Sequence, residues 1–419
     1  MATPKLALIP TGYKAGKLYS VLPESGVGDF TVVRATEATR VNEEGLIETM
    51  GANVPRLDYS GGGCPVLLTE PQRTNRITHS EDFSNAAWSK VNSNITINNQ
   101  ISPDGTLNAS LMASTSAGSY ISDSLATYNP SDFSIFVKYI DQQFVQLYSG
   151  ASGNFYATFD IQNQVIGASG AWTSNLKIEN YGNNWYRISC VFTGAAVGSS
   201  VRIGFAQSLT STWGGLNTSF GTSLLLYGAM LENSSYPTSY IKTSGSAVTR
   251  NGDLVNGAGD AATFNDSEGV LMVEVKSIAD TGVSASFYLG DGTLANRLQI
   301  LLRSTGIISS YYQNTSLSTI MDSTILNYDS LHKVAVVYNS TALQIWVDGI
   351  KQNETLGNHS FTPSTLNVLS MNVNGSEIIY GNTKQLQYFD SALTDSELET
   401  LTSWTSFIEM AQALNYNII

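Results

Sequence analysis

The stretch HKVAVVYNSTALQIWVDGIKQ, from His332 to Gln352, decides the fold class of this chain. Its two runs of alternating apolar residues are joined by Asn339–Thr341, and the second run turns at Asp348–Gly349. An Asp-Gly pair between apolar strands is a strong short-range signal for a β-hairpin. We therefore predict consecutive antiparallel strands in this stretch, joined by tight turns.

The same alternation predicts strands over most of the remaining sequence. In DFSIFVKY, every second residue from Phe133 to Tyr139 is apolar, which is the period of a half-buried strand. Gly-, Asn- and Ser-rich turns separate such runs, and no helical pattern lies between them. Other residues predicted to share a buried face are Tyr186, Ile188, Cys190 and Phe192; Leu271, Val273 and Val275; and Leu298, Ile300 and Leu302. We predict an all-β fold with two antiparallel β-sandwich domains, of jelly-roll or concanavalin-like type.

Only the C-terminal end of the sequence has a helical pattern. Thr394 and Glu397 have the spacing of a capping box. The residues that follow at helical spacing are Leu398, Leu401, Thr405 and Ile408. We predict one short helix in this region.

Composition divides the sequence into three parts. Residues 1–75 hold six of the ten prolines and the run Gly61–Gly63, so this part is predicted to be irregular, with little core of its own. One β pattern occupies residues 76–253, and a second occupies residues 254–419. We expect an N-terminal attachment segment that is ordered by a partner, followed by two sandwiches. The alternative is that the segment packs back on the first sandwich or stays a mobile leader.

The charge balance argues against nucleic acid as a partner. The chain has 21 Lys and Arg residues against 34 Asp and Glu residues, a formal net charge of −13, and only 13% of its residues are charged. Binding of a phosphate backbone requires a basic face, and no cluster of Lys or Arg forms one. No apolar run reaches the roughly 18 residues of a membrane span, and the start MATPKLALIP lacks a signal-peptide core. We expect neither membrane insertion nor ordinary secretion.

The placement of cysteine and histidine predicts no disulfide framework, metal site or cofactor. Cys190 is expected to be a buried thiol in a strand, whereas Cys64 lies in the turn GGGCP. His79, His332 and His359 are scattered and lack the spacing of metal ligands. Calcium binding stays open, although the sequence offers no convincing cluster of oxygen ligands.

The sequence lacks the carboxylate pair that glycoside hydrolysis requires. Such a pair commonly lies on one strand face, as in an E-x-D-x-E run. Glu274 stands alone in its predicted strand, and Asp291 and Asp348 each precede a glycine, as turn residues do. Glu397 and Glu399 belong to the predicted helix. We therefore predict no catalytic residues and no enzymatic activity.

Four aromatic residues are candidates for carbohydrate binding, which uses flat aromatic faces beside amide and hydroxyl groups. Trp213 is the strongest candidate, because the two glycines after it leave no strand face that would bury it. Trp172 in SGAWTSN and the pair Tyr311 and Tyr312 are the others. The alternative is that each packs on its own sandwich, as we expect of Trp185 and Trp346 in regular strands.

Several phrases of the sequence resemble those of structural proteins of tailed-phage virions that carry a head-spike or fibre module. They occur in the same order as in those proteins, over about residues 28–253. The phrases are GDFTVVRATEATRVNEEGLIE (Gly28–Glu48), NVPRLDY (Asn53–Tyr59), LLTEPQRTNRITHSEDFSNAAWSK (Leu67–Lys90), SPDGT (Ser102–Thr106), NNWYRISCVF (Asn183–Phe192), YGAMLENSSYPTSYIKT (Tyr227–Thr243) and VTRNGD (Val248–Asp253). The resemblance implies a virion subunit that docks on capsid or tail proteins and is exposed on the particle surface.

A second resemblance covers about residues 260–405. The opening stretch, followed by GNTKQLQYFDSALTDSELETL (Gly381–Leu401), is similar to the laminin-G-like or concanavalin-like sandwich superfamily. This implies the fold more than the function, because such sandwiches serve as lectins, spacers and hydrolases. Together the resemblances imply a head fibre, spike or tail fibre, expected to be a homotrimer, whose sandwiches bind host surface glycan. The alternatives are a stand-alone glycan-binding adhesin, a glycan-degrading enzyme of concanavalin-like fold, and inert decoration of the particle.

Overall fold

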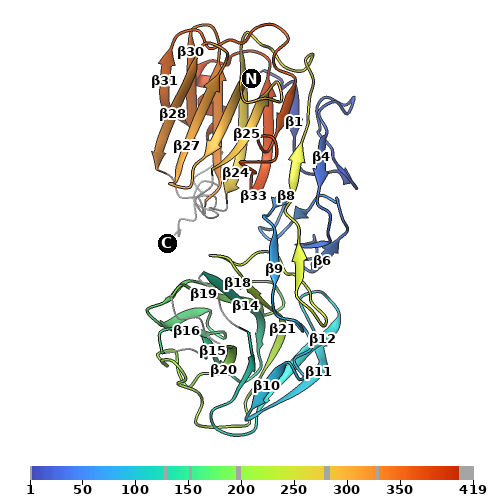
Figure 1. Ribbon diagram of the computed structural model, residues 1–419, viewed down its shortest axis with the longest axis vertical. Helices are drawn as coiled ribbons and strands as arrows, with labels where there is room; N and C mark the ends of the chain where they lie inside the picture. Colours follow the sequence, from blue (N-terminus) through green and yellow to red (C-terminus); the bar gives the residue numbers. More distant parts are fainter. Residues whose placement is uncertain are drawn as a thin grey trace. The chain divides into compact units, whose positions relative to one another are not determined.

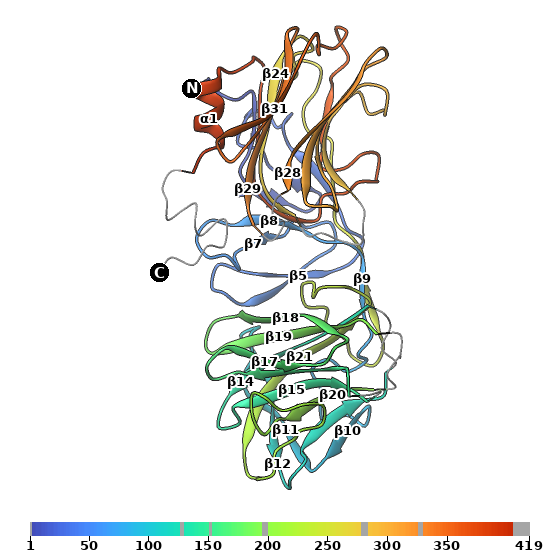
Figure 2. The same cartoon turned by 90° about the vertical axis from the view of Figure 1, so that its left-hand side faces the viewer.

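The computed structural model is almost entirely β-structure and divides into two compact units (Figures 1 and 2). It describes residues 2–125, 130–150, 153–194, 200–277, 284–325 and 330–404. Unit 1 consists of Met1–Thr36, Met50–Pro71 and Gly252–Ile419, and unit 2 consists of Glu37–Thr49 and Gln72–Asn251. The prediction of an all-β chain with antiparallel sandwiches is confirmed.

Unit 2 is a sandwich of two six-stranded antiparallel sheets, and the chain crosses between them several times, as in a jelly roll. In spatial order, the first sheet contains β10 (Trp88–Val91), β13 (Tyr120–Asp123), β20 (Val201–Phe205), β15 (Phe144–Ser149), β16 (Tyr156–Asp160) and β17 (Val165–Ser169). The second contains β11 (Ser93–Ile101), β12 (Leu107–Ser114), β21 (Ser223–Glu232), β14 (Ser131–Tyr139), β19 (Trp185–Phe192) and β18 (Thr173–Asn180). We call them the β15 sheet and the β14 sheet.

The core of unit 2 is formed by the residues that the alternation selects. Phe133, Ile135 and Val137 of β14 are fully buried, and so are Ile188 and Cys190 of β19. Burial of a side chain of this size stabilises the fold by roughly 1.5–3 kcal/mol. The predicted buried faces are confirmed, and Cys190 is a buried free thiol as expected.

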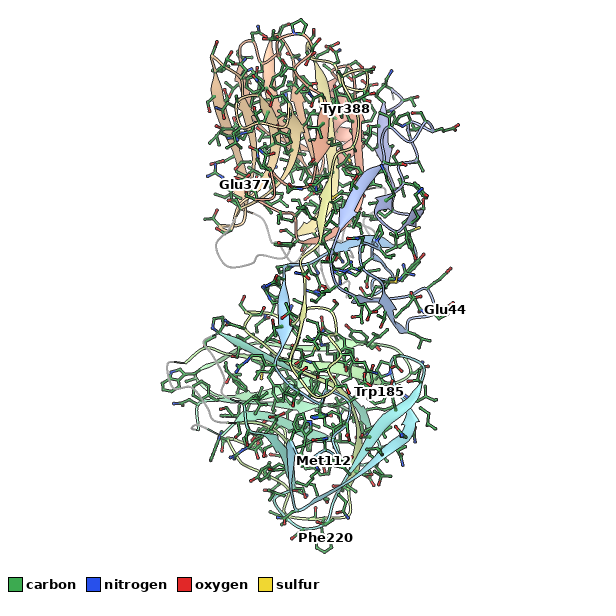
Figure 3. All side chains as sticks on the ribbon, turned by 45° about the vertical axis from the view of Figure 1, so that its right-hand side comes forward. Glu44, Met112, Trp185, Phe220, Glu377 and Tyr388 are labelled. Carbon is green, nitrogen blue, oxygen red and sulfur yellow. The ribbon has the colours of Figure 1, made fainter. Side chains whose placement is uncertain are left out.

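A further layer covers part of the outer face of the β14 sheet. It includes a hairpin that packs through Ile47 into the same cluster as Phe136 and Trp185, the last of which is labelled in Figure 3. The small elements of unit 2 are the hairpin strands β5 (Ala38–Val41) and β6 (Ile47–Met50) and the paired strands β9 (Arg73–Asn75) and β22 (Val248–Arg250). The sandwich therefore has an extra layer of chain on this face.

Unit 1 is a second sandwich, built from three antiparallel sheets. The eight-stranded sheet contains β31 (Ile350–Leu356), β30 (Ala342–Val347), β29 (His332–Tyr338), β24 (Gly269–Ser277), β33 (Gly381–Phe389), β8 (Val66–Thr69) and β7 (Leu57–Asp58), with β1 (Leu6–Leu8) also paired to β33. The five-stranded sheet contains β28 (Ser318–Ile325), β27 (Ile307–Gln313), β26 (Arg297–Leu302), β25 (Ala285–Gly290) and β32 (Val368–Ser370). The four-stranded sheet contains β2 (Tyr13–Lys14), β3 (Lys17–Leu18), β4 (Phe30–Val33) and β23 (Leu254–Asn256).

The hairpin that decided the fold class is present as predicted. β29 pairs with β30, and β30 pairs with β31 across the turn at Asp348 and Gly349. Both turn residues have positive φ, 49° for Asp348 and 83° for Gly349, as a two-residue Asp-Gly hairpin turn requires. The inward-facing residues of β29 and β30, such as Val334 and Ile345, join a core that includes Tyr388, which Figure 3 labels. Their outward-facing residues Ala335, Val337 and Trp346 pack in the cluster that contains α1.

The predicted helix is α1 (Asp395–Thr402), and it has the predicted capping box. The Thr394 hydroxyl accepts a hydrogen bond from the Glu397 N–H, and the Glu397 carboxylate accepts one from the Thr394 N–H. Leu398 and Leu401 are buried in a cluster with outward-facing residues of the eight-stranded sheet. The other predicted helical positions, Thr405 and Ile408, lie outside the described residues.

Residues 1–75 are not a segment apart from the sandwiches, which corrects the prediction. β1 and β8 both pair with β33, and β4 pairs with β23, so most of this part belongs to the sheets of unit 1. The prolines shorten the strands but leave enough backbone donors between them for pairing. The core of unit 1 includes seven apolar residues from this part: Leu6, Leu8, Leu18, Phe30, Val32, Leu57 and Leu67.

A buried ionic cluster joins this N-terminal part to the start of the second β pattern. Arg56 donates hydrogen bonds to Glu70, at 2.6 Å, and to Asp253, and Arg34 donates to Asp253 at 2.8 Å. All four residues are at most 3% exposed. Burial acts to lower the pKa of Arg56, but the two carboxylates outweigh burial and raise it. We call these four residues the Arg56 cluster.

One buried carboxyl group of unit 2 lacks such partners. Asp132, near the start of β14, is fully buried, and neither of its carboxyl oxygens has a hydrogen-bond partner. Burial, followed by the charge of Glu232, raises the pKa of Asp132 well above its usual value, although Arg187 acts in the opposite direction. Asp132 is therefore protonated in the folded chain at pH values where it is ionised in the unfolded chain.

We expect Asp132→Asn to raise the free energy of unfolding at neutral pH by roughly 1 kcal/mol or more, because the amide is uncharged without taking up a proton, and each unit by which a carboxyl pKa is raised costs about 1.4 kcal/mol there. A raised carboxyl pKa costs stability as pH rises above the unfolded value of about 4, so the gain should disappear below that pH. Chemical denaturation of both proteins at acidic and neutral pH measures the difference.

The matched control for this prediction is Asp104→Asn. Burial acts to raise the pKa of Asp104, but hydrogen bonds from Ser102 and Thr106 outweigh it and lower the pKa. Because a lowered carboxyl pKa stabilises the fold at neutral pH, the control should be less stable there. If Asp132→Asn gained nothing at neutral pH, the assignment of Asp132 as an unpaired protonated group would be wrong.

Candidate functional site

The structure removes Tyr312 from the predicted sugar-binding residues. Tyr312 of β27 is fully buried in the core of unit 1, and its hydroxyl donates a hydrogen bond to the Ser360 carbonyl at 2.7 Å. Neighbouring residues of a strand point to opposite faces of the sheet, so only one member of the tyrosine pair could be exposed. The prediction for Tyr312 is therefore wrong.

Tyr311 lies on the outer face of the five-stranded sheet, but one face of its ring is already occupied. The Arg297 guanidinium lies 4.6 Å from the ring centroid. The Tyr311 hydroxyl donates to the Gln313 side chain at 2.8 Å and accepts from Ser318 at 3.1 Å, a bond that lowers the pKa of Tyr311. These contacts leave only part of the ring available to a ligand.

Trp172 is 39% exposed in the turn before β18. Its ring contacts Phe155 edge-on, with the two ring centroids 5.2 Å apart. Gly194 approaches so closely that a Cβ atom there would lie 2.6 Å from the Trp172 ring. Trp172 therefore covers the edge of the unit 2 core and shows part of its ring to solvent.

Trp213 presents its indole at the surface, on the loop between β20 and β21. It is 36% exposed. Its indole N–H donates a hydrogen bond to the Ser149 carbonyl at 2.9 Å, and its ring contacts Tyr148 edge-on with centroids 6.2 Å apart. The side chain is therefore fixed in orientation while about a third of it stays accessible.

One buried side chain holds the backbone on both sides of Trp213. The Gln146 amide donates to the Thr212 carbonyl and accepts from the Gly214 N–H, both at 2.9 Å. Thr158 on the adjacent strand β16 donates to the same loop at 3.0 Å. We call Trp213, with Gln146, Tyr148 and Thr158 beneath it, the Trp213 platform.

A cation lies on the same outer face of the β15 sheet. The Arg202 guanidinium is 5.2 Å from the ring centroid of Tyr120 and 5.6 Å from that of Tyr148. Burial raises the pKa of Tyr148, so its hydroxyl stays protonated at neutral pH. Tyr148 itself is only 1% exposed, so the groups of this face that a sugar can contact are the accessible part of Trp213 and the partly buried Tyr120 and Arg202.

Comparison with known proteins finds distant likenesses only. No family model and no curated protein matches this chain. Among solved structures, the chain is similar to the CBM40 module of Ruminococcus gnavus IT-sialidase bound to α2,3-sialyllactose, at 16% identity and a TM-score of 0.31, over 35% of this chain and 94% of that one. It is also similar to the heptameric SAP-like pentraxin of Limulus polyphemus, at 11% identity and a TM-score of 0.28, over 33% of this chain and 71% of that one.

A third likeness is to leech intramolecular trans-sialidase complexed with 2,7-anhydro-Neu5Ac. It has 16% identity and a TM-score of 0.31, and covers 36% of this chain and 26% of that one. Each of the three likenesses extends over about a third of this chain.

Metal-binding side chains do not gather in the part of the chain that the structure describes. No group of three or more His, Cys, Asp or Glu residues there is placed to hold a metal ion. In the same residues, no helix has the length and hydropathy needed to cross a membrane.

Sequence reasoning found Trp213 but missed the residues that support it. In FVQLYS, Gln146 and Tyr148 alternate with the core residues Val145 and Leu147. The strand pattern therefore predicts that Gln146 and Tyr148 lie on the outer face of the sheet. That signal was available in the sequence. The loop that these two residues hold lies more than sixty positions further along the chain, and no local pattern links them.

Proposed function

We propose that this chain is a non-enzymatic structural subunit of a tailed-phage appendage, and that it binds glycan of the host surface at the Trp213 platform. The observation that carries the glycan-binding part is Trp213, a residue that is 36% exposed although its indole is fixed by a 2.9 Å hydrogen bond to Ser149. A flat aromatic surface of this kind stacks against the C–H face of a pyranose ring. The phage assignment is supported by the ordered phrases between residues 28 and 253.

The fixed position of Trp213 favours binding, because a preorganised surface loses little conformational entropy when a ligand binds. Gln146 contributes to this by holding the residues before and after Trp213, and Gln146 itself is fully buried. A ligand that contacts Trp213 does not need to order the loop first. A fixed loop therefore favours a binding surface at which each ligand makes only a few contacts.

We expect Trp213→Ala to weaken glycan binding by about 1–3 kcal/mol, the typical cost of removing a large aromatic contact at a binding hot spot. The protein is first screened on an array of bacterial surface polysaccharides, and the strongest binder is then titrated by calorimetry. Trp172→Ala is the matched control, because Trp172 has a similar exposure and lies in the same unit. The control should keep its affinity, and both variants should remain folded.

Equal affinity of Trp213→Ala and the parent protein would place the glycan site elsewhere. A large fall in the melting temperature of Trp213→Ala would instead identify Trp213 as a core residue. The melting temperature and the affinity are therefore measured on the same preparations, so that the two outcomes are separated.

The docking part of the proposal uses the exposed apolar side chains of the N-terminal part of unit 1. The N-terminal part has not kept its strands free to extend a partner's sheet, because β1 and β8 already pair with β33 of unit 1. Its surface nevertheless presents large apolar side chains that are 36–45% exposed, and a capsid or tail protein would cover them. They are Ile9, Tyr19, Val21, Val27 and Val33.

The assembly part of the proposal is a homotrimer exposed on the virion surface. β31, an edge strand of the eight-stranded sheet, carries Ile350 and Leu356, which are 63% and 79% exposed, and β28, an edge strand of the five-stranded sheet, carries Ile320, which is 51% exposed. Exposed apolar residues at sheet edges favour association unless another chain covers them. Neighbouring copies of the subunit would provide that cover.

A further inference from the structure

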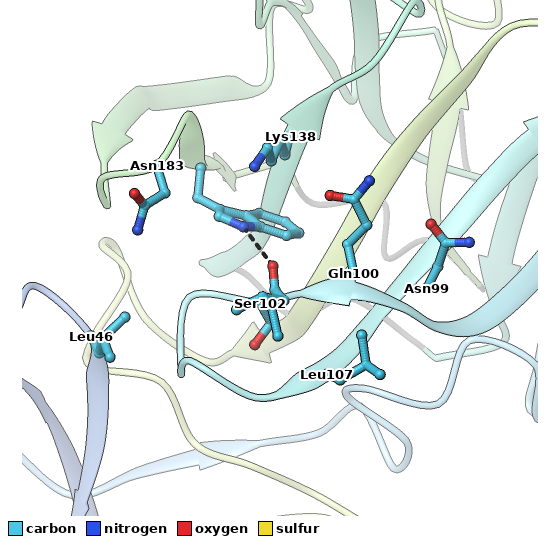
Figure 4. A pocket seen from close by; sticks show the side chains of 9 residues that line it. Leu46, Asn99, Gln100, Ser102, Leu107, Lys138 and Asn183 are labelled. Carbon is cyan, nitrogen blue, oxygen red and sulfur yellow. Dashed lines mark hydrogen bonds between the residues drawn. The ribbon is translucent and has the colours of Figure 1, made fainter.

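A groove of about 550 Å³ lies on the other face of unit 2, outside the β14 sheet (Figure 4). Its volume is within the roughly 300–1,000 Å³ range of small-ligand sites. The groove is separate from the Trp213 platform, which belongs to the β15 sheet. Its polar side chains come mainly from β11, from the end of β14 and from the turn before β19.

Three consecutive residues of β11, Asn99, Gln100 and Ile101, all line this groove. In a regular strand, consecutive side chains point to opposite faces. Here the pairing of β11 with β12 shifts register on both sides of Gln100, and Asn98 has a positive φ of 51°. A bulge of this kind redirects side chains, and bulges are frequent beside functional sites.

Trp185 connects the rim of the groove to the sheet. Its indole N–H donates a hydrogen bond to the Ile101 carbonyl at 3.2 Å, drawn as a dashed line in Figure 4. Trp185 is also the direct cross-strand partner of Lys138 on β14. The bulged strand and the lysine are thereby held beside the same ring.

Ser102 of the groove donates a hydrogen bond to Asp104 at 2.7 Å, but in the described part of the chain the other four polar side chains that line it have no such partner. Within the described residues, the side chains of Asn99, Gln100 and Asn183 make no hydrogen bond, and Lys138 makes no ion pair. No Asp or Glu lines the groove. An amide both donates and accepts hydrogen bonds, as a sugar hydroxyl does, whereas an ammonium group donates to a carboxylate.

We propose that this groove binds an acidic saccharide, with the sugar carboxylate on Lys138 and its hydroxyls on the amides of Asn99, Gln100 and Asn183. The net charge of −13 makes the chain as a whole repel such a ligand, so selective binding requires a local cation. Lys138 supplies one, beside three free amides. The choice of saccharide as ligand rests on the proposed glycan-binding function, but the site does not include Trp213.

The test compares two ligands that differ only at C6, methyl β-D-glucuronide and methyl β-D-glucoside, by calorimetric titration of the full chain. We expect the glucuronide to bind about tenfold more tightly, which corresponds to about 1.4 kcal/mol, since its carboxylate accepts a charge-assisted hydrogen bond from Lys138. Lys138→Gln should remove this preference, and Lys138→Arg should keep most of it. Lys177→Gln, which changes a half-buried lysine of β18 in the same sheet, should leave it unchanged.

Further variants and ligands distinguish binding in the groove from binding at the Trp213 platform. Trp213→Ala should keep the preference for the glucuronide even if it weakens other glycan binding, so the two proposals can fail independently. If Arg202→Gln lost the preference for the glucuronide, the sugar carboxylate would be bound on the β15 sheet and the inference would be wrong. Equal affinity for both sugars, or equally tight binding of an N-acetylglutamate amide, would also overturn it.

Discussion

A chain that begins at Thr74 is expected to lose the fold of unit 1. The truncation removes β1, β7 and β8 from the eight-stranded sheet and seven buried apolar side chains from the core. At roughly 1.5–3 kcal/mol for each side chain, the loss is about 10–20 kcal/mol, whereas a whole domain is usually stable by about 5–15 kcal/mol. Limited proteolysis should digest the region after residue 252 in the truncated chain and spare it in the full chain.

The control for the truncation is a chain that begins at Lys5. It lacks only residues before β1, and these contribute nothing to the described core. It should resist proteolysis as the full chain does. A protease-resistant unit 1 in the chain that begins at Thr74 would show that residues 1–73 decorate a sandwich that is complete without them.

Arg56→Met is expected to lower the free energy of unfolding by about 3–5 kcal/mol, the usual cost of removing one partner of a buried ion pair. Methionine has a length similar to that of the aliphatic part of arginine, so the packing around position 56 changes little. The substitution removes the ion pair of Arg56 with buried Glu70 and one of the two arginines that pair with Asp253, which keeps Arg34 and the Glu70 N–H. Chemical denaturation of unit 1 in the full chain measures this loss.

Arg303→Met is the matched control for the Arg56 cluster. Arg303 pairs with Asp322 at 3.3 Å, but the two side chains are 29% and 45% exposed. An exposed pair contributes about 0–1 kcal/mol, so this variant should be nearly as stable as the parent. Similar losses in both arginine variants would mean that burial of the Arg56 cluster does not set its energetic importance.

The strands were predictable because their signal is local. The alternation from Phe133 to Val137 selected the buried face of β14, and the Asp-Gly turn at residues 348–349 set the register of the last hairpin. The capping box of Thr394 and Glu397 gave the start of α1 in the same way. In each case the pattern and the structure that it determines lie within about ten residues.

The role of the N-terminal part was not predictable, because its partners are distant in sequence. Leu6–Leu8 pairs with residues around Leu386, and Arg56 depends on Asp253, almost two hundred positions later. Strands of two to four residues are too short to show alternation. A proline-rich stretch without a pattern therefore indicates a separate segment, although in the structure it completes the sandwich of unit 1.

The site was predictable only in part, for the same reason. The Gly-Gly pair after Trp213 indicates an exposed indole. The hydrogen bonds from Gln146 to the residues on both sides of Trp213, however, depend on a loop that folds back over the β15 sheet. The groove beside Lys138 depends on a bulge in β11, which places consecutive polar residues on one face against the ordinary alternation. A sequence pattern based on period two cannot reveal a site that the bulge creates.

Electron cryomicroscopy of phage particles that contain this chain tests the central claim most directly. The account predicts three copies of the chain in a surface appendage, with the N-terminal part of unit 1 against the capsid or tail and Trp213 facing solvent. Particles incubated with the polysaccharide selected on the array should show added density beside Trp213. Absence of the chain from purified particles, or burial of Trp213 against another virion protein, would contradict the account.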